Sequence, residues 1–378
     1  MTVQRRDFLR ALGVGTAGVL LAPRFSARGA EAATLERSAT RSFAGLIRLD
    51  SNENPIGPFP GALDAIRAQF GEANRYPDDA EDVLVAAIAA QHGVRPEQVI
   101  LGCGSGELLQ LCAQRFTAPT RGLVSASPTF ETPARFAKML GHPVTEVRVT
   151  GALQLDLDAM AVAARGAGLV FLCNPNNPTG TVHGAAAVRD FIARVHRESS
   201  ETMLLVDEAY HEYVDAAGYS SYIPEVKDDA HVIVSRTFSK VFGLAGLRVG
   251  YAIAAPATAR ALAPWRVGSG VNQLAAVAAL ASLSDTARIR AEQERNRTVK
   301  RWTREQFERM GYAVGASDAN FLMVDIKRDI RAVRAACRAQ GVAVGRPFPP
   351  LDTHLRLTIG TADEMERAMQ VLGGALKA

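Results

Sequence analysis

Apolar runs and helical patterns alternate along residues 61–284 of the chain. The segments 99–101, 169–173, 203–206 and 232–234 are short, continuous apolar stretches, and polar or glycine-rich residues follow each of them. Continuous apolar runs of this length are typical of parallel strands that are buried on both faces. The pattern therefore predicts an α/β fold with a large, doubly wound and mostly parallel sheet.

The pattern changes near residue 285. Residues 285–311 have the periodicity of one long helix, and an apolar strand at 321–326, a helix at 332–340 and a strand around Arg356 follow it. We therefore expect a large domain over residues 61–284 and a smaller α/β domain over residues 285–378. Residues 33–60 are predicted to be an N-terminal arm, whose segment 48–58 joins the small domain or a dimer partner.

Charge and cysteine content exclude some functions. The chain has a formal net charge of +4, and the five arginines and two acids of residues 1–32 account for +3 of it, so the remainder is close to neutral. No basic stripe or recognition helix is visible, and we expect no nucleic-acid partner. The four cysteines have no metal-ligand spacing, so we expect no metal site and interpret all four as small buried residues.

Lys240 follows one of the predicted strands, within a segment rich in hydroxyls and glycine. A lysine amine condenses with an aldehyde when it is held near the carbonyl and its pKa is lowered. Thr237 and Ser239 offer hydroxyl groups to a phosphate, and Arg248 offers a guanidinium group. Because ligands bind at the carboxyl ends of strands in open α/β sheets, this pattern favours a covalent cofactor site over a solvated surface lysine.

Two neighbouring strand ends carry matching polar residues. Asp207 ends an apolar run, and a buried acid needs a cationic partner such as the protonated nitrogen of a pyridine ring. Tyr210 and Asn177 are placed to bind the ring oxygen of the same cofactor, pyridoxal 5'-phosphate. The alternative is that Asp207 caps a helix and Asn177 belongs to a turn. Three such strand ends together favour the cofactor site.

A glycine-rich turn between a predicted strand and helix supplies a candidate phosphate site. The backbone amides around Gly104, Ser105 and Gly106 lie where the helix begins, and helix N-termini bind anions. The turn lacks the spacing of a Walker A motif or a dinucleotide fingerprint.

Taken together, these motifs resemble the class I/II aminotransferases of fold type I, and most of all their histidinol-phosphate aminotransferase branch. Similar segments occur in the family's order across nearly the whole chain: 50–58, 74–78, 102–107, 127–130, 174–180, 206–210, 235–248 and 355–360. The resemblance implies a homodimeric enzyme that moves an amino group between an L-amino acid, or an amino-alcohol phosphate such as histidinol phosphate, and a 2-oxo acid.

The resemblance also implies a role for each matching residue. Lys240 is the lysine that binds the cofactor and then moves a proton at the substrate Cα, and Asp207 keeps the ring nitrogen protonated. Arg356 grips the substrate α-carboxylate through a bidentate pair. The remaining cofactor contacts are assigned as follows: Asn177 and Tyr210 to the ring oxygen; Gly104, Ser105, Gly106, Thr237, Ser239 and Arg248 to the phosphate; Phe130 stacked on the ring; and Tyr76 to the phosphate of the partner subunit.

Three positions bear on the choice of substrate. Arg346 resembles the family's second arginine, near the distal group of the substrate, and the alternative is a loop arginine that packs against the small domain. Asn54 occupies a place that carries tyrosine in some relatives and is a candidate substrate contact, and Ile56 replaces a common aromatic residue. A decarboxylase or lyase of the same fold, or a non-catalytic module that binds the cofactor, is an alternative function, although retention of Lys240 and Asp207 argues against the latter.

The N-terminus resembles a Tat signal peptide, which is read by the machinery that exports folded proteins. Arg5 and Arg6 precede Phe8 and Leu9, and a short apolar stretch and small residues follow up to residue 32. The apolar stretch is too short and glycine-rich for a secure membrane span. We therefore expect a periplasmic or secreted enzyme, with a cytoplasmic enzyme carrying an N-terminal extension as the alternative.

Overall fold

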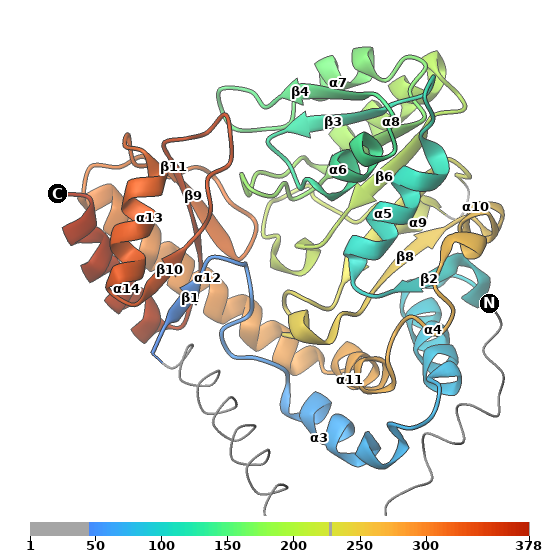
Figure 1. The fold of residues 1–378 in the computed structure, drawn as a ribbon, viewed down its shortest axis with the longest axis horizontal. Helices are drawn as coiled ribbons and strands as arrows, with labels where there is room; N and C mark the ends of the chain where they lie inside the picture. Colours follow the sequence, from blue (N-terminus) through green and yellow to red (C-terminus); the bar gives the residue numbers. More distant parts are fainter. Residues whose placement is uncertain (1–44, 227–228, 378) are drawn as a thin grey trace, which may run out of the picture. The chain divides into compact units, whose positions relative to one another are not determined.

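A seven-stranded sheet forms the centre of this computed structural model, which describes residues 45–226 and 229–377. The strand order is β2-β8-β7-β6-β5-β3-β4, and β8 is the strand that runs antiparallel to its two neighbours (Figure 1). The strands are β2 (Val99–Gly102), β3 (Leu123–Ser127), β4 (Val144–Arg148), β5 (Leu169–Cys173), β6 (Met203–Asp207), β7 (Val232–Thr237) and β8 (Gly250–Ala254). The predicted α/β fold with a large, mostly parallel sheet is confirmed.

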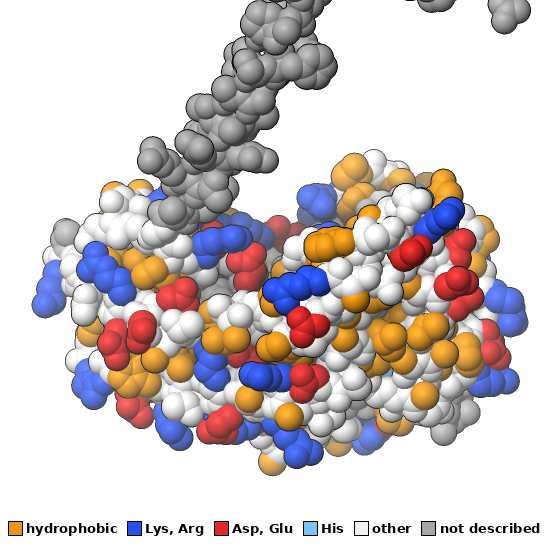
Figure 2. Space-filling model, turned by 90° about the horizontal axis from the view of Figure 1, so that it is seen from below, with side chains coloured by type: hydrophobic (Ala, Val, Ile, Leu, Met, Phe, Trp, Pro, Cys, Tyr) orange, Lys and Arg blue, Asp and Glu red, His pale blue; other side chains and the backbone are white. Residues whose placement is uncertain are grey.

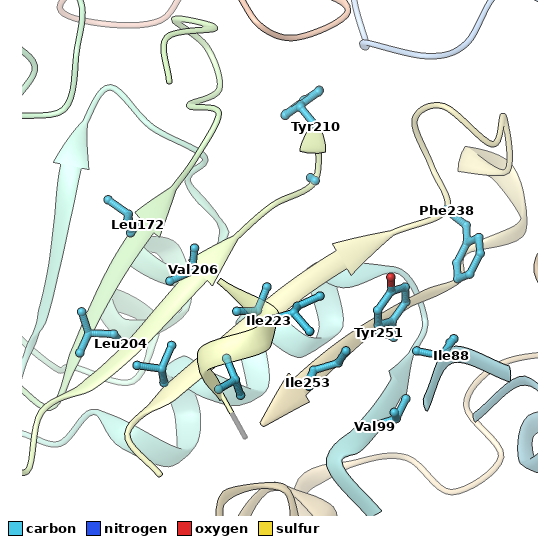
Figure 3. Close-up of a cluster of buried hydrophobic side chains, with 14 of the residues drawn as sticks. Ile88, Val99, Leu172, Leu204, Val206, Tyr210, Ile223, Phe238, Tyr251 and Ile253 are labelled. Atoms are coloured by element: carbon cyan, nitrogen blue, oxygen red, sulfur yellow. The ribbon is translucent and has the colours of Figure 1, made fainter. Parts of the chain in front are cut away.

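Helices cover both faces of this sheet because the strand residues alternate between two hydrophobic clusters. On one face, Leu172, Val206 and Val234 pack with residues of α3 (Pro60–Gln69), α4 (Asp78–His92), α7 (Leu157–Ala163), α8 (Ala185–Glu198) and α11 (Gln273–Leu283), as seen in part in Figure 3. On the other face, Phe171 and Leu205 pack with α5 (Ser105–Phe116), α6 (Thr132–Met139) and α10 (Pro256–Leu262). Burial on both faces explains why these strands are continuous apolar runs.

The C-terminal part of the chain has a hydrophobic cluster of its own. The long helix α12 (Thr286–Arg309) leads to β9 (Phe321–Asp325), which pairs antiparallel with β11 (His354–Thr358). Two further helices, α13 (Ile330–Ala339) and α14 (Ala362–Ala375), pack on these strands. Near the start of the described chain, β1 (Ile47–Leu49) pairs in parallel with β10 (Val342–Val344) and adds Leu49 to the same cluster (Figure 1).

Residues from Ile47 onward form one compact unit, and the exact domain boundaries at 60 and 284 stay predictions. No helix within residues 45–226 and 229–377 has the length and hydropathy needed to cross a membrane. The predicted signal peptide at residues 1–32 lies outside the described residues. The expectation that all four cysteines are buried was wrong for Cys103, which is exposed because it lies in the turn between β2 and α5.

Candidate active site

A cavity of about 570 Å³ opens at the carboxyl ends of β5, β6 and β7. This edge is where open α/β sheets place their ligands. Residues from distant parts of the chain line the cavity, and they include most of the predicted site: Ser105, Gly106, Phe130, Asn177, Asp207, Tyr210, Thr237, Ser239, Lys240, Arg248, Arg346 and Arg356.

Lys240 lies three residues beyond the end of β7, with its amine inside the cavity. Its Nζ donates a hydrogen bond to the backbone oxygen of Asn52 at 3.2 Å and lies 5.5 Å from the centre of the Tyr210 ring. Burial lowers the pKa of Lys240 to about 8, and the positive charge of Arg356 adds to the effect. About a tenth of an amine with this pKa is uncharged at pH 7, far more than of an ordinary lysine, and the uncharged form can react with a carbonyl group.

Asp207, at the end of β6, is buried between its two neighbouring strands. The register places it beside Cys173 of β5 and Ser235 of β7, and Ser235 Oγ donates to Asp207 Oδ1 at 2.7 Å. Burial raises the pKa of Asp207 to about 6, although the bond from Ser235 opposes this rise. A buried carboxyl group without an ionic partner is costly, so a cationic ligand in the cavity would stabilise its charged form.

Tyr210 is fixed by contacts from two directions. Its hydroxyl accepts a hydrogen bond from Asn52 Nδ2 at 2.9 Å, and its ring packs edge-on against Phe321 with centroids 5.3 Å apart. Asn52 is itself held in the left-handed region, with φ of 55°, by the Thr358 hydroxyl, which accepts a hydrogen bond from the backbone N–H of Asn52 and donates one to its Oδ1. Asn52 therefore orients both Tyr210 and Lys240.

The start of α5 forms a narrow phosphate cradle. Gly104 has φ of 73°, and a Cβ atom there would collide with the guanidinium group of Arg248. A Cβ atom at Gly250 would lie 2.5 Å from the backbone nitrogen of Ser105. Thr237 Oγ1 and Ser239 Oγ are 2.9 Å apart at the same end of the cavity. Free amides at a helix N-terminus, two hydroxyls and one arginine make a donor set for a phosphate dianion.

Arg356 brings a buried cation to the opposite side of the cavity. Its Nη1 donates to Asn177 Oδ1 at 2.8 Å and its Nη2 donates to the backbone oxygen of Asp50 at 2.5 Å. Within the described chain, its Nε is buried without a hydrogen-bond partner, and no carboxylate pairs with the group. Burial lowers the pKa of Arg356 to about 10. Because Asn177 accepts through its oxygen, its amide nitrogen is left to donate to a ligand.

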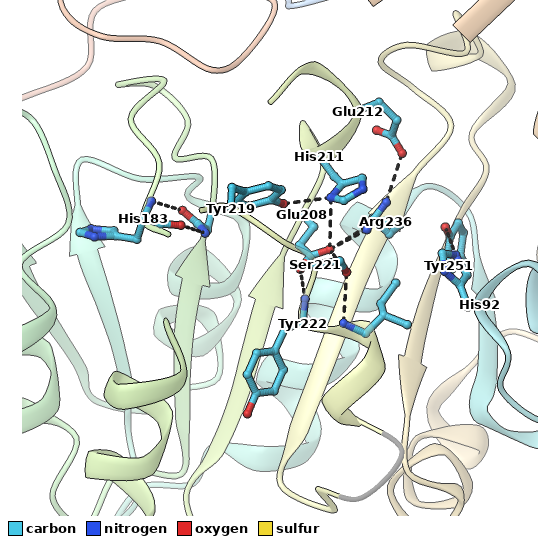
Figure 4. A network of polar contacts seen from close by, with 12 residues as sticks. His92, His183, Glu208, His211, Glu212, Tyr219, Ser221, Tyr222, Arg236 and Tyr251 are labelled. Carbon is cyan, nitrogen blue, oxygen red and sulfur yellow. Dashed lines mark hydrogen bonds and ion pairs between the residues drawn. The ribbon is translucent and has the colours of Figure 1, made fainter. Parts of the chain in front are cut away.

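A buried ion-pair network supports the site from the other side of β6 and β7. Arg236 Nε donates to Glu208 Oε2 at 2.8 Å, and Arg236 Nη1 lies 3.2 Å from Glu212 Oε1 (Figure 4). Glu208 also accepts bonds from Ser221 Oγ and from the backbone of Tyr222, both at 2.7 Å. Arg236 and Glu208 neighbour Thr237 and Asp207 in the sequence, so the pair fixes the strand ends that present the cavity side chains.

Three predicted site residues do not line the cavity: Gly104, which lies directly before the lining residue Ser105, Asn54 and Tyr76. Asn54 is buried, and it uses its side chain locally: Nδ2 donates to the oxygen of Val241 at 2.8 Å, and Oδ1 accepts from the backbone of Ile56 at 2.9 Å. A substrate contact for Asn54 stays a prediction. Tyr76 is 84% exposed and does not line this chain's own cavity.

Sequence reasoning missed several residues that line or support the cavity. Asn52 lines it and Ser235 bonds to Asp207; neither has a distinctive spacing, although Asn52 belongs to segment 50–58, which resembles the family. Phe348 and Arg334 also line the cavity, and their positions depend on how the C-terminal strands and helices pack.

The residues fit pyridoxal 5'-phosphate. The cradle at α5 matches a phosphate, the buried Asp207 needs a cationic partner, and Lys240 supplies an amine of lowered pKa. These features define an α/β enzyme that holds an aldehyde cofactor on a lysine.

Comparison with known proteins identifies the family. The model described as "Aminotransferase class I and II" matches residues 44–372, and the chain belongs to this family. The protein is therefore an aminotransferase that depends on pyridoxal 5'-phosphate.

Individual relatives refine this picture. The chain is 41% identical to a histidinol-phosphate aminotransferase of Moorella thermoacetica, over 86% of this chain and 84% of the relative. It is 36% identical to an aromatic amino acid aminotransferase of Rhodococcus jostii, over 86% and 88% of the two chains. The structure resembles that of the histidinol-phosphate aminotransferase from Sinorhizobium meliloti in complex with pyridoxal 5'-phosphate, with a TM-score of 0.81, 28% identity and coverage of 87% and 90%.

Proposed function

We propose that the amino donor is an L-amino acid or an amino-alcohol phosphate such as histidinol phosphate, and that the acceptor is a 2-oxo acid. The observation that carries this proposal is Arg356, a buried guanidinium group that lines the same cavity as Lys240 and has no described anionic partner. An α-carboxylate is the complement of such a group. The name of the relative from Moorella thermoacetica supports the phosphate donor.

The side chains of this site have separate tasks in the transfer. Thr237, Ser239, Arg248 and the amides at the start of α5 would hold the phosphate of the cofactor, and Asp207 would pair with its ring nitrogen. When bound, pyridoxal phosphate would supply an aldehyde for the substrate amine and an electron sink for the charge that develops at the substrate Cα.

Lys240 then acts on the proton at the substrate Cα. Its pKa of about 8 lets the amine accept that proton and return it at neutral to mildly alkaline pH. Asn52, whose backbone oxygen accepts from Nζ at 3.2 Å, orients the amine. Arg356 and Asn177 orient the substrate so that the bond to hydrogen, and not the bond to the carboxylate, is the one broken.

Aromatic L-amino acids are a second candidate donor class for the same reaction. The relative from Rhodococcus jostii carries that activity in its name, and Phe130 and Phe348 line the cavity. Half-reactions with a panel of donors, followed by the absorbance of the holoenzyme, test both classes. Conversion of histidinol phosphate or an L-amino acid supports the proposal. Stoichiometric release of CO₂ would instead indicate a decarboxylase.

We also propose that the enzyme is a homodimer with shared sites. Two aromatic residues between α3 and α4 are exposed, Tyr76 at 84% and Phe70 at 60%. Figure 2 shows hydrophobic side chains between charged ones on one side of the molecule. Sedimentation measures the oligomeric state. If Tyr76 completes the partner's phosphate site, mixing inactive Lys240→Ala and Tyr76→Ala chains should restore some activity, and its absence would oppose shared sites.

We further propose export by the Tat pathway, because Arg5 and Arg6 begin the signal-like segment. Lysine does not reproduce the guanidinium fork. Replacing both arginines with lysine should therefore leave active, uncleaved enzyme in the cytosol, whereas the wild type is exported. Wild-type enzyme that stays in the cytosol with an intact N-terminus would contradict this proposal.

A further inference from the structure

An ion pair joins Arg346, which lines the cavity, to Glu131, which lines a neighbouring pocket. Arg346, just beyond β10, lies 2.8 Å from Glu131, the residue before α6, through its Nη2 and a carboxylate oxygen. Both side chains are about half exposed, at 47% and 63%. Arg346 also donates to the oxygen of Pro347 at 2.9 Å. The arginine that the family resemblance assigns to the distal group of the substrate is thus already paired with an acid of this chain.

Arg346 and Arg356 contact the same aromatic ring. The guanidinium carbon of Arg346 lies 4.3 Å from the centre of the Phe348 ring, and that of Arg356 lies 4.7 Å from it. The two guanidinium groups are therefore within about 9 Å of each other, by the sum of these two distances. Arg356 is buried without an anion, whereas Arg346 is neutralised by Glu131.

A third arginine adds positive charge to the same wall. Arg334 of α13 lines the cavity and, in the described chain, makes no side-chain hydrogen bond or ion pair. When Glu131 remains paired with Arg346, only Arg334 is available to an anionic ligand at the distal end of the site. When the ligand displaces Glu131, both Arg334 and Arg346 are available to it.

We propose that Glu131 is a specificity-determining residue that competes with the substrate for Arg346. The inference rests on the proposed function and deepens it: by pairing with Arg346, Glu131 weakens the binding of every anionic distal group, and a dianionic phosphate displaces it more readily than a carboxylate does. A phosphate monoester carries about −1.5 to −2 charges near pH 7, and it can engage Arg346 and Arg334 together.

The exposure of the pair sets the size of the effect. Half-exposed salt bridges contribute little to stability, so a dianionic ligand can replace Glu131 on Arg346. A neutral donor gains no ion pair with Arg346 and therefore does not displace Glu131. Removing the competing charge should raise kcat/KM for phosphate donors about 1.4- to fivefold, which is the range that weak surface pairs allow.

The test compares Glu131→Gln with Glu146→Gln, a matched change at an acid of the same neighbouring pocket that pairs with Lys138 and not with Arg346. For each holoenzyme, kcat/KM is measured for an amino-alcohol phosphate, an acidic amino acid and a neutral aromatic amino acid. Equilibrium binding of inorganic phosphate to the holoenzyme is measured in parallel, because it does not depend on turnover.

Glu131→Gln should raise kcat/KM for the phosphate donor, tighten phosphate binding and leave kcat/KM for the neutral donor unchanged. Glu146→Gln should change none of these quantities. Arg334→Gln should weaken both phosphate readouts. An equal change for all donors, or weaker phosphate binding in Glu131→Gln, would overturn the inference, and so would a wild type that binds no phosphate. Failure of the proposed function is a separate result, namely no amino transfer from any donor.

Discussion

Replacement of Arg356 by alanine should damage the half-reaction with a 2-oxo acid far more than it damages the fold. The guanidinium group is buried, donates at 2.8 Å to Asn177 and at 2.5 Å to the oxygen of Asp50, and keeps Nε unpartnered. Leaving a bound carboxylate without its buried partner costs roughly 2–4 kcal/mol. This corresponds to a loss of about 30- to 1000-fold in kcat/KM.

The assay is single-turnover absorbance with a 2-oxo acid and, separately, with an amino-alcohol phosphate, which has no α-carboxylate. Arg356→Lys keeps the charge but loses the planar fork, so it should recover only part of the activity. Arg331→Ala, at an exposed arginine paired with Asp352, is the control and should behave like the wild type. An unchanged kcat/KM for the 2-oxo acid in Arg356→Ala would refute the assignment of Arg356 to the α-carboxylate.

Three further predictions concern the cofactor site and its support. Burial raises the pKa of Asp207 to about 6, so the folded apoenzyme binds more protons than the unfolded chain between about pH 4 and 6. The stability of the apoenzyme therefore falls as pH rises through that window. Asp207→Asn should make the apoenzyme more stable by on the order of 1–3 kcal/mol at pH 8 and by less at pH 4, as measured by urea unfolding. An equal stability difference at both values would contradict this. Gly104→Ala should lower cofactor affinity, measured by equilibrium dialysis, because the new Cβ collides with Arg248 at a φ of 73°; full retention of the cofactor would show that the cradle tolerates the change. Arg236→Met should cost about 3–5 kcal/mol of unfolding free energy, because it leaves the buried Glu208 without its ion pair, and a loss below 1 kcal/mol would count against this.

Strand ends were the part of the site that the sequence could predict. Asp207, Asn177 and Lys240 follow apolar runs, and parallel strands bring such positions to one edge of a sheet, where the cavity is found. The long helix expected over residues 285–311 is confirmed as α12, at Thr286–Arg309.

Contacts between segments far apart in the chain could not be predicted in the same way. Asn52 reaches Tyr210 because β1 pairs with a C-terminal strand and because Asn52 has a positive φ. Neither feature can be predicted from the identity of this residue. Asn54, two positions later, was chosen by resemblance, but its amide is used to hold the loop at Val241. The pair between Arg346 and Glu131 joins residues more than two hundred positions apart, so their separation in the sequence gives no hint of it.

Mass spectrometry of the borohydride-treated holoenzyme tests the central claim, that Lys240 holds the cofactor, most directly. The account predicts loss of the visible absorbance band and a reduced cofactor adduct on the peptide that contains Lys240, because this buried amine has a lowered pKa and shares its cavity with Asp207 and the phosphate cradle. The adduct should be absent from Lys240→Ala. An adduct on another lysine of the wild type would contradict the account.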